Sequence, residues 1–386
     1  MKGKVINLNA VGLAKIWYLA TVIPIPPWLS ENINEIIFSY LWGENKSEPI
    51  GRETVFLPKE KGGLGLLQPT THSLAIRTKY LQHVVNPSET AKWVYTTRYW
   101  IGFQIGRLNP VWEHLRKNHL PKPDRDLFPE YWADCLQLMK NINIQTLKWN
   151  SSDIRKIIQT KNYVEPNAQP LWRKLGKQDT KWDNTWKGIY TTQAEGKHQD
   201  VHYKFIHMAL YTNQNLSRFK GSTQHPLCDF CKTKNKEVTE THIHVIRQCQ
   251  NSHLLWNRMF PLLRKILKEK RIRVIQILFN TFPAGVPTAA QKIAVTVAQV
   301  TSHKIWTNRN NFKHQNIIPD LDISQKQILH ALANIIKANY NKRKREKALQ
   351  RFQSDFCVHP DFCYLENGKL HIPFNANSEP PSYLGT

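Results

Sequence analysis

Three cysteines and two histidines are crowded into one short stretch of the sequence, CDFCKTKNKEVTETHIHVIRQC, which runs from Cys228 to Cys249. Cys228 and Cys231 form a Cys-x-x-Cys pair, whose two thiolates can reach one ion from a single tight turn at about 2.3 Å each. Cys249 supplies a third thiolate, and His244 or His242 supplies an imidazole. These residue types at this spacing indicate a zinc site.

His244 is the imidazole that we expect to bind the metal. With it the array reads Cys-x2-Cys-x12-His-x4-Cys, and a short turn or the start of a helix would bring His244 and Cys249 to one side. His242 is the alternative ligand, or a hydrogen-bond donor to the ligands. Because four protein ligands fill a tetrahedral ion, we expect a structural zinc that contributes on the order of 10 kcal/mol to local folding.

Redox chemistry and simple burial account for the cysteines less well than a zinc site does. A redox Cys-x-x-Cys belongs to a thioredoxin-like βαβ unit, which the surrounding sequence does not indicate. Buried free cysteines would not be separated by a loop as polar as KTKNKEVTE. A second group, Cys357, His359 and Cys363, has a spacing that matches no zinc finger, and we expect ordinary packing or a loose tail there.

The composition favours a polyanionic partner. Lys and Arg number 54 against 29 Asp and Glu, which gives a net charge of +25 over 386 residues. These cations are spread along the chain rather than along one amphipathic helix, which favours nucleic acid over an anionic membrane. A merely basic surface is the alternative. The six cysteines are too few for a secreted disulfide scaffold and favour a reducing compartment.

Apolar periodicity predicts a mainly α chain. Residues 4–23 are expected to form a buried helix, too interrupted by Lys15 and Pro24 to cross a bilayer. Residues 31–42, with Ser30 as the cap, predict a second helix, and residues 54–57 predict a strand. Further helices are expected from Thr288 into IWTNRNNF and from Ser324 into NKRKREKALQRF, because both have capping-box spacing.

Three glycines, Gly62, Gly63 and Gly65, lie in one short stretch after the predicted strand. A phosphate loop would end in Lys-Ser/Thr and would lie between a strand and a helix, and neither condition is met. A turn that requires positive φ is therefore expected at these glycines.

Two parts of the chain resemble the C-terminal part of reverse transcriptases encoded by LINE-type, non-LTR retrotransposons. In the zinc-binding segment of that family, Cys-x-x-Cys is followed by Glu-Thr-x-x-His, then a Cys and a Trp. Those places are occupied here by Glu240, Thr241, His244, Cys249 and Trp256. The downstream KIWTNRNNF is similar to the Trp-x-x-Arg-Asn element of the family. The stretches LNAVGLAKIWYLATVIPIP, YLWG and RETVFLPKEKGGLGL look like the thumb and the region that connects it.

The resemblance implies a zinc-containing fragment that binds RNA template, target DNA or both, with the rest of the retrotransposon polyprotein as a further partner and no membrane contact. The palm carboxylates and the endonuclease of the family are not visible in the sequence, so we expect no catalytic residue and no enzyme activity. The run NKRKREK indicates nuclear residence, with the cytoplasm as the alternative.

The expected fold is mainly helical, with a helical thumb-like N-terminal region, a helical middle and a small CCHC zinc finger followed by a C-terminal helical region. Five segments are predicted: a thumb-like and connecting region over 1–85, a helical region of unassigned identity over 86–200, a CCHC zinc-binding domain over 201–262, a basic helical region over 263–353 and an extended tail over 354–386. The expected metal ligands are Cys228, Cys231, His244 and Cys249.

Basic residues in two stretches are the expected phosphate contacts, with solvated helix faces as the alternative. Trp256 and Trp306 lie on apolar helical stripes and are expected in the core rather than as stacking platforms. A different function class is a module that docks a protein through the finger and helices, and the salt dependence of binding separates the two. The expected contacts are Arg264, Lys265, Lys268, Lys270, Arg271, Arg273, Lys342, Arg343, Lys344, Arg345 and Lys347.

Overall fold

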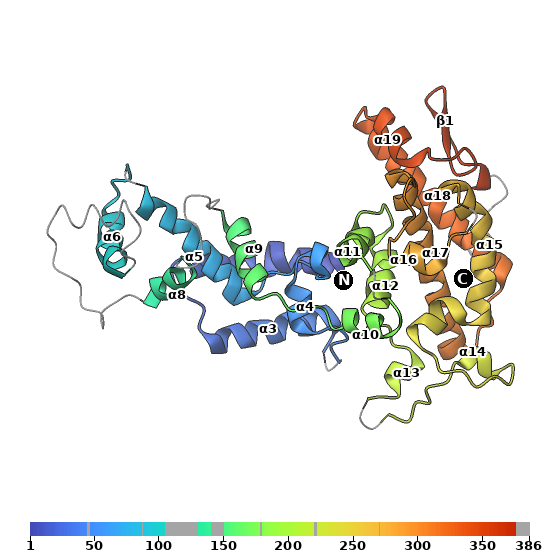
Figure 1. The fold of residues 1–386 in the computed structure, drawn as a ribbon, viewed down its shortest axis with the longest axis horizontal. Coiled ribbons are helices and arrows are strands. Elements are labelled where there is room, and N and C mark those ends of the chain that lie inside the picture. The colour runs from blue at the N-terminus through green and yellow to red at the C-terminus, as the bar shows by residue number, and fades with distance from the viewer. Residues whose placement is uncertain are drawn as a thin grey trace, which may run out of the picture. The chain divides into compact units, whose positions relative to one another are not determined.

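The computed structural model describes residues 1–44, 47–86, 88–104, 130–139, 150–177, 180–219, 222–269 and 271–375. The chain is mainly helical, as the sequence predicted (Figure 1). It divides into two compact units, and each is described by itself. Unit 1 comprises Met1–Pro58 and Gly63–Glu165, and unit 2 comprises Lys59–Gly62 and Pro166–Thr386.

Unit 1 is organised around α5 (Pro69–Val85), which packs against α2, α3, α6, α8 and α9. Ala75 and Leu81 of α5 are fully buried together with Ile101, Cys135 and Ile154 of its neighbours. The other helices of the unit are α1 (Lys2–Asn7), the π-turn η1 (Leu8–Gly12), α2 (Ala14–Ala20), α3 (Pro27–Trp42), α4 (Arg52–Phe56), α6 (Lys92–Gln104), α8 (Glu130–Met139) and α9 (Ser151–Lys161).

The prediction of one buried helix over residues 4–23 is wrong in two respects. The segment forms α1, η1 and α2 in succession, and its apolar residues are only partly covered. Leu13 and Ala20 are buried, whereas Tyr18 and Leu19 are 79% and 62% exposed. The reason is that the apolar residues of this stretch cover more of the helix circumference than one packed face can bury.

The helix predicted to start after Ser30 begins earlier, because Pro27 occupies its first turn, where a missing N–H costs nothing. The strand predicted over residues 54–57 is also wrong, since Arg52–Phe56 forms the short helix α4. Val55 and Phe56 are both buried, although consecutive residues of a strand point to opposite faces. Packing on more than one side of this stretch therefore outweighs its β-branched composition.

The predicted glycine turn is confirmed, with φ of 90° at Gly62 and 69° at Gly65. Gly63 is constrained for another reason, because a Cβ at this position would lie 1.8 Å from the Leu57 carbonyl oxygen. Backbone cannot move aside as the tip of a side chain can, so this position admits glycine alone.

We expect Gly63→Ala to destabilise unit 1 by about 3 kcal/mol, since the new methyl group must displace backbone. Gly3→Ala is the matched control, because Gly3 lies in α1 and nothing stands within 4 Å of its added Cβ. That control should be neutral or slightly stabilising in urea unfolding. Equal unfolding midpoints for the two variants would contradict the close approach at Gly63.

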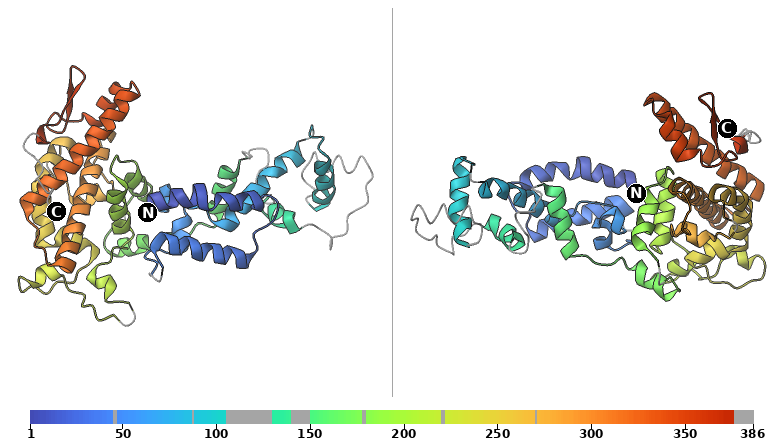
Figure 2. Two further views of the ribbon diagram at one scale, coloured as in Figure 1. Left: turned by 180° about the vertical axis from the view of Figure 1, so that it is seen from behind. Right: turned by 45° about the horizontal axis from the view of Figure 1, so that its top comes forward.

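Unit 2 is organised around the long helix α17 (Thr288–Gln315), which packs against α11, α12, α14, α15, α16, α18 and α19. Figure 2 shows the surrounding helices from two further sides. The other elements are η2 (Lys59–Lys61), α10 (Ala168–Lys174), α11 (Trp182–Tyr190), α12 (Gly196–Ile206), α13 (Asn213–Leu216), α14 (Asp229–Lys232), the π-turn η5 (His244–Gln248), α15 (Gln250–Leu267), α16 (Val274–Leu278), α18 (Leu321–Arg345), α19 (Leu349–Phe356), β1 (Tyr364–Glu366), β2 (Lys369–His371) and η6 (Pro373–Asn375).

The two long helices predicted near the C-terminus are present, but the second ends at Arg345 instead of continuing through LQRF, which belongs to α19. The cap of the first is Pro287 rather than Thr288. α17 begins at Thr288, and α18 begins at Leu321, where the Asp320 carboxylate accepts a hydrogen bond from the Ile323 N–H (2.8 Å). Asp320, rather than Ser324, is therefore the cap of α18, and the buried Ser324 accepts a hydrogen bond from Asn308 of α17 instead.

Part of the segment predicted as an extended tail is folded. After α19, strands β1 and β2 form an antiparallel hairpin in which Tyr364 pairs with His371. Phe362 and Cys363, just before β1, are buried. Residues 376–386 of the predicted tail lie outside the described residues. Of the helices in the described ranges, none combines the length and apolarity that crossing a membrane requires.

Candidate metal centre

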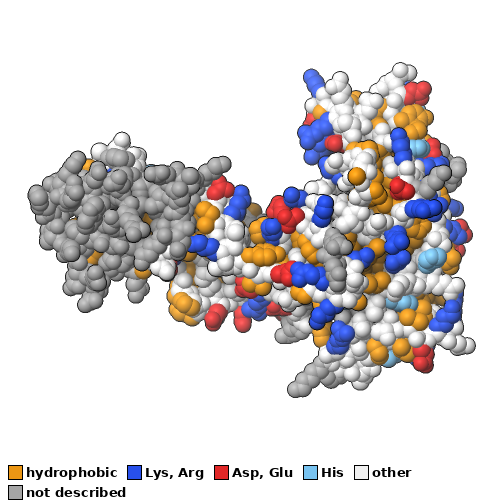
Figure 3. All heavy atoms as spheres, in the orientation of Figure 1, with side chains coloured by type: hydrophobic (Ala, Val, Ile, Leu, Met, Phe, Trp, Pro, Cys, Tyr) orange, Lys and Arg blue, Asp and Glu red, His pale blue; other side chains and the backbone are white. Residues whose placement is uncertain are grey.

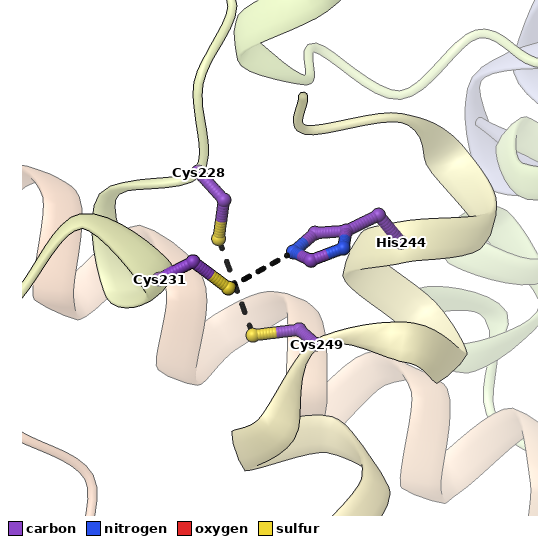
Figure 4. A group of neighbouring side chains, drawn as sticks. All are labelled: Cys228, Cys231, His244 and Cys249. Atoms are coloured by element: carbon purple, nitrogen blue, oxygen red, sulfur yellow. Dashed lines mark hydrogen bonds between the residues drawn. The ribbon is translucent and has the colours of Figure 1, made fainter. Parts of the chain in front are cut away.

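Four side chains converge in unit 2, and they are the four predicted from the sequence. The Sγ atoms of Cys228, Cys231 and Cys249 and a ring nitrogen of His244 all lie within 4.8 Å of one another, and all four residues are buried (Figure 4). Cys228 Sγ is 4.0 Å from Cys249 Sγ, and Cys231 Sγ is 3.4 Å from His244 Nε2. Two sulfurs on one tetrahedral zinc stand about 3.8 Å apart, so the cluster has the size of such a site.

The first two ligands come from a closed loop. Cys228 directly precedes α14, and its N–H donates to the Val238 carbonyl (2.8 Å), next to an antiparallel bridge between Leu227 and Thr239. Cys231 lies on α14, and its carbonyl accepts hydrogen bonds from the N–H groups of Lys234 and Lys236, both at 3.0 Å. The polar residues between the second and third ligands therefore form a folded turn that fixes both thiols.

The second two ligands lie at opposite ends of a single π-turn. The Cys249 N–H donates to the His244 carbonyl (2.7 Å), five residues earlier, and Cys249 then precedes α15. A His-x4-Cys spacing thus places both side chains on one side of the backbone, as predicted. Single π-turns often occur at functional sites, because the wider turn re-aims the side chains at its ends.

His242 does not join the cluster. Its Nε2 lies 3.2 Å from the Asn215 side-chain nitrogen, and that amide also donates to the carbonyls of Met208 and Leu210. Burial lowers the pKa of His242 to about 4, which keeps the ring neutral. Among the described residues, the group that could hold a metal ion contains His244 and not His242.

We expect His244→Ala to lose the bound metal and His242→Ala to keep it. Only His244 offers a ring nitrogen to the three thiols, whereas His242 connects the segment to the loop before α13. Both predictions are checked by measuring the metal content per chain after gel filtration in a buffer with a mild chelator. Loss of metal in His242→Ala with retention in His244→Ala would reverse the assignment.

The thiols affect one another electrostatically. A hydrogen bond with Cys249 raises the pKa of Cys228, and the same contact lowers the pKa of Cys249. Burial raises the pKa of Cys231. Three neighbouring thiolates need a positive charge among them to remain deprotonated together, and a bound divalent ion would supply it. Three sulfurs and one imidazole, with no fifth ligand among the described residues, suit a closed structural site.

Neighbouring side chains fix the turn that carries His244. Thr241 Oγ1 accepts a hydrogen bond from the His244 N–H (3.0 Å). The Trp256 indole N–H, on α15, donates to the Ile246 carbonyl (2.8 Å), and Trp256 is buried, as predicted. Both residues therefore position the ligand turn without touching the cluster.

A buried ion pair connects the metal-binding segment to α17. The Arg309 guanidinium meets the Glu240 carboxylate at 2.5 Å, and the two side chains are only 7% and 1% exposed. Glu240 also accepts from the Asn213 N–H (2.7 Å), and the Asn213 side chain accepts from Arg309 (2.8 Å). Both stretches carry recognisable motifs in the sequence, but their contact was not predicted, because a separation this long along the chain leaves no periodic signal.

An aromatic contact connects the same two elements. The Phe230 ring, inside the Cys-x-x-Cys pair, stacks on Phe312 of α17 with centroids 4.1 Å apart and an interplanar angle of 14°. Trp306, predicted in the core, is half-buried with the Arg309 guanidinium 5.0 Å from its ring centroid. Neither contact was predicted from the sequence.

Cys357, His359 and Cys363 do not form a group that could hold a metal ion. Cys363 is buried, and its thiol donates to the Phe356 carbonyl (3.4 Å). His359 Nδ1 accepts from the Asp361 N–H (3.2 Å). In the described part of the chain, the Cys228 cluster is the one group that could hold an ion, so Cys363 is a packed residue, as predicted.

The predicted phosphate contacts are largely at the surface of unit 2. Lys265 pairs with Asp361, and Arg343 pairs with Glu346 (2.7 Å). Lys270 lies outside the described residues. Exposed residues of the set are Arg264, Lys265, Lys268, Arg271, Arg273, Lys342, Lys344, Arg345 and Lys347.

Comparison with models of known protein families finds no match for this chain, and no curated protein matches it. The geometry of the cluster and the charge of the surface are therefore the observations that bear on its function.

Proposed function

We propose that the chain is a zinc-containing, nucleic-acid-binding part of a LINE-type reverse transcriptase, which grips RNA template or target DNA and performs no catalysis itself. The observation that carries the proposal is the exposed basic end of α18 together with the turn that follows it. Lys342, Lys344, Arg345 and Lys347 are all exposed there, and the one carboxylate among them, Glu346, is paired with Arg343. Such a group of cations attracts phosphate and releases its counterions.

The charge distribution on unit 2 supports this proposal. Figure 3 shows Lys and Arg side chains over the visible face of unit 2, including a group near the end at which α19 projects. Over the whole chain, 54 Lys and Arg stand against 29 Asp and Glu, so acidic side chains are too few to pair with every cation. A surface of this kind binds a polyanion along its length by contacts that do not read sequence.

The metal centre has a structural role in this proposal. Cys228, Cys231, His244 and Cys249 would hold zinc, which would cross-link the loop around α14 to the start of α15. Glu240 and Phe230 then fasten that cross-linked segment to α17. The ion thus shapes one side of a basic unit, and the chain's own cations contact the phosphates.

The test is binding of a fluorescent single-stranded oligonucleotide across a series of salt concentrations. The plot of log K against log salt should have a steep slope. The magnitude of that slope should fall by about 3 when Lys342, Lys344, Arg345 and Lys347 are changed to alanine, because each phosphate contact contributes about 0.7. The control removes the same amount of charge from unit 1, by changing to alanine the exposed residues Lys15, Lys92, Lys156 and Lys161. Equal slopes for both quadruple variants would contradict the proposed contact surface.

A further inference from the structure

A groove of about 590 Å³ opens onto the cysteine cluster, and every residue that lines it belongs to unit 2. One wall is the loop that follows α14, and the other is formed by the start of α15 and the segment between α17 and α18. Pockets of this size accept a small organic group. No pattern in the sequence indicates this groove, because its walls come from three separate stretches.

Several apolar side chains of the lining are open to solvent. Leu254 is 40% exposed, Val238 is 38% exposed and Ile318 is 81% exposed, and all three line the groove. Phe230 and Phe312, the stacked pair, also contribute to the lining. These apolar side chains give the groove a surface that can cover one face of a small apolar group.

Three residues of the cysteine cluster, Cys231, His244 and Cys249, contribute to the lining, and its other polar groups are mainly amides and lysines. Gln248, Gln250 and Asn251 offer amide donors and acceptors, and Lys234 and Lys236 offer positive charge. The Lys234 ammonium group donates a hydrogen bond to the Gln250 side chain (3.1 Å). Among the described residues of the lining there is no carboxylate, and the charge of a bound ion would offset the thiolates of Cys231 and Cys249, so Lys234 and Lys236 favour an occupant with negative charge beside an apolar surface.

We propose that this groove receives an unpaired nucleobase of single-stranded RNA or DNA, with Lys234 and Lys236 on the adjoining phosphates. The inference rests on the proposed function and names the part of the surface that reads single strands. A nucleotide joins a flat apolar ring to a phosphate at a short, fixed distance, which is the combination that the groove offers. Aliphatic and aromatic walls hold such a ring by its faces, and amide side chains pair with its edge.

A protein segment with acidic and apolar residues is the competing occupant, and the comparison of single-stranded with double-stranded nucleic acid separates the two. In a duplex the bases are stacked and paired, so a base-binding groove contributes to single-strand affinity alone. If the groove instead binds a protein segment, substitutions in its lining should change neither the single-strand affinity nor the duplex affinity.

The experiment uses the zinc-loaded full chain with Leu254→Asn and Ile318→Asn combined. Both side chains are partly or largely exposed, so the change removes apolar contact and keeps net charge and fold. Affinity for an unstructured single-stranded RNA or DNA oligonucleotide should fall about 10-fold, which is the contribution expected of one stacked base. The slope of log K against log salt should stay unchanged, because no cation is removed. Affinity for a duplex of equal length should stay within about twofold.

The matched control combines Ile317→Asn with Ile323→Asn. These residues are 51% and 43% exposed, lie near Ile318 in sequence and do not line the groove. The control should bind single strands as the unmodified chain does, and both double variants should retain zinc. Single-strand affinity that is equal in the two double variants would overturn the inference while leaving the proposed function intact, whereas absence of nucleic-acid binding by the unmodified chain would overturn both.

Discussion

Cys231→Ser is expected to reduce zinc from about one ion per chain to below about 0.1. The serine hydroxyl is a poor zinc ligand, and a structural site that loses one of four ligands loses most of an apparent binding energy on the order of 10 kcal/mol. Without the ion, the loop between Leu227 and Thr239 is held by one isolated bridge, the hydrogen bonds around α14, the bonds from Asn213 and the stacking of Phe230 on Phe312, and no ligand would cross-link it to the start of α15. Amide hydrogen exchange should therefore lose protection over residues 225–256.

The rest of the molecule should remain folded in that variant. Unit 1 has its own core around Leu81 and Ile154, and α17 of unit 2 is buried against several other helices. Cys357→Ser is the matched control, because it makes the same chemical change at a half-buried cysteine outside the cluster. Full zinc content in Cys231→Ser, or equal loss of zinc in Cys357→Ser, would show that the ion is held elsewhere.

Local spacing was sufficient to predict that Cys228, Cys231, His244 and Cys249 converge, because they lie within a short stretch and each pair is brought together by one turn. Cys228 and Cys231 flank the start of α14, and His244 and Cys249 flank a π-turn. The choice of His244 over His242 also followed from spacing, although what His242 does instead depends on Asn215, in another part of the chain.

Contacts between distant stretches were not predictable in the same way. The strand predicted over residues 54–57 is a helix because packing of Val55 and Phe56 decides that stretch, and periodicity does not record which surfaces will be covered. The groove beside the cluster has the same origin. Ile318 and Leu254 are merely apolar residues in the sequence, and only folding brings them to one opening.

The buried pair between Glu240 and Arg309 gives the largest expected loss of stability. Arg309→Met should lower the free energy of unfolding by about 3–5 kcal/mol, because it leaves the Glu240 carboxylate buried without its cation. Glu240→Met should cost a similar amount, and it also removes the acceptor of the Asn213 N–H. The double variant should recover part of the loss, since two apolar side chains leave no uncompensated charge.

Urea unfolding of the zinc-loaded chain measures these differences, with the slope m unchanged. Arg258→Met is the matched control, since Arg258 pairs with Asp322 at a surface where the two side chains are 32% and 75% exposed, and such pairs contribute below about 1 kcal/mol. Glu240→Met should also surrender zinc to a chelator at least about 10-fold more readily than Arg258→Met, because Glu240 supports the segment that carries Thr241 and His244. Equal zinc retention in the two variants would mean that the ion pair stabilises α17 without positioning the metal ligands.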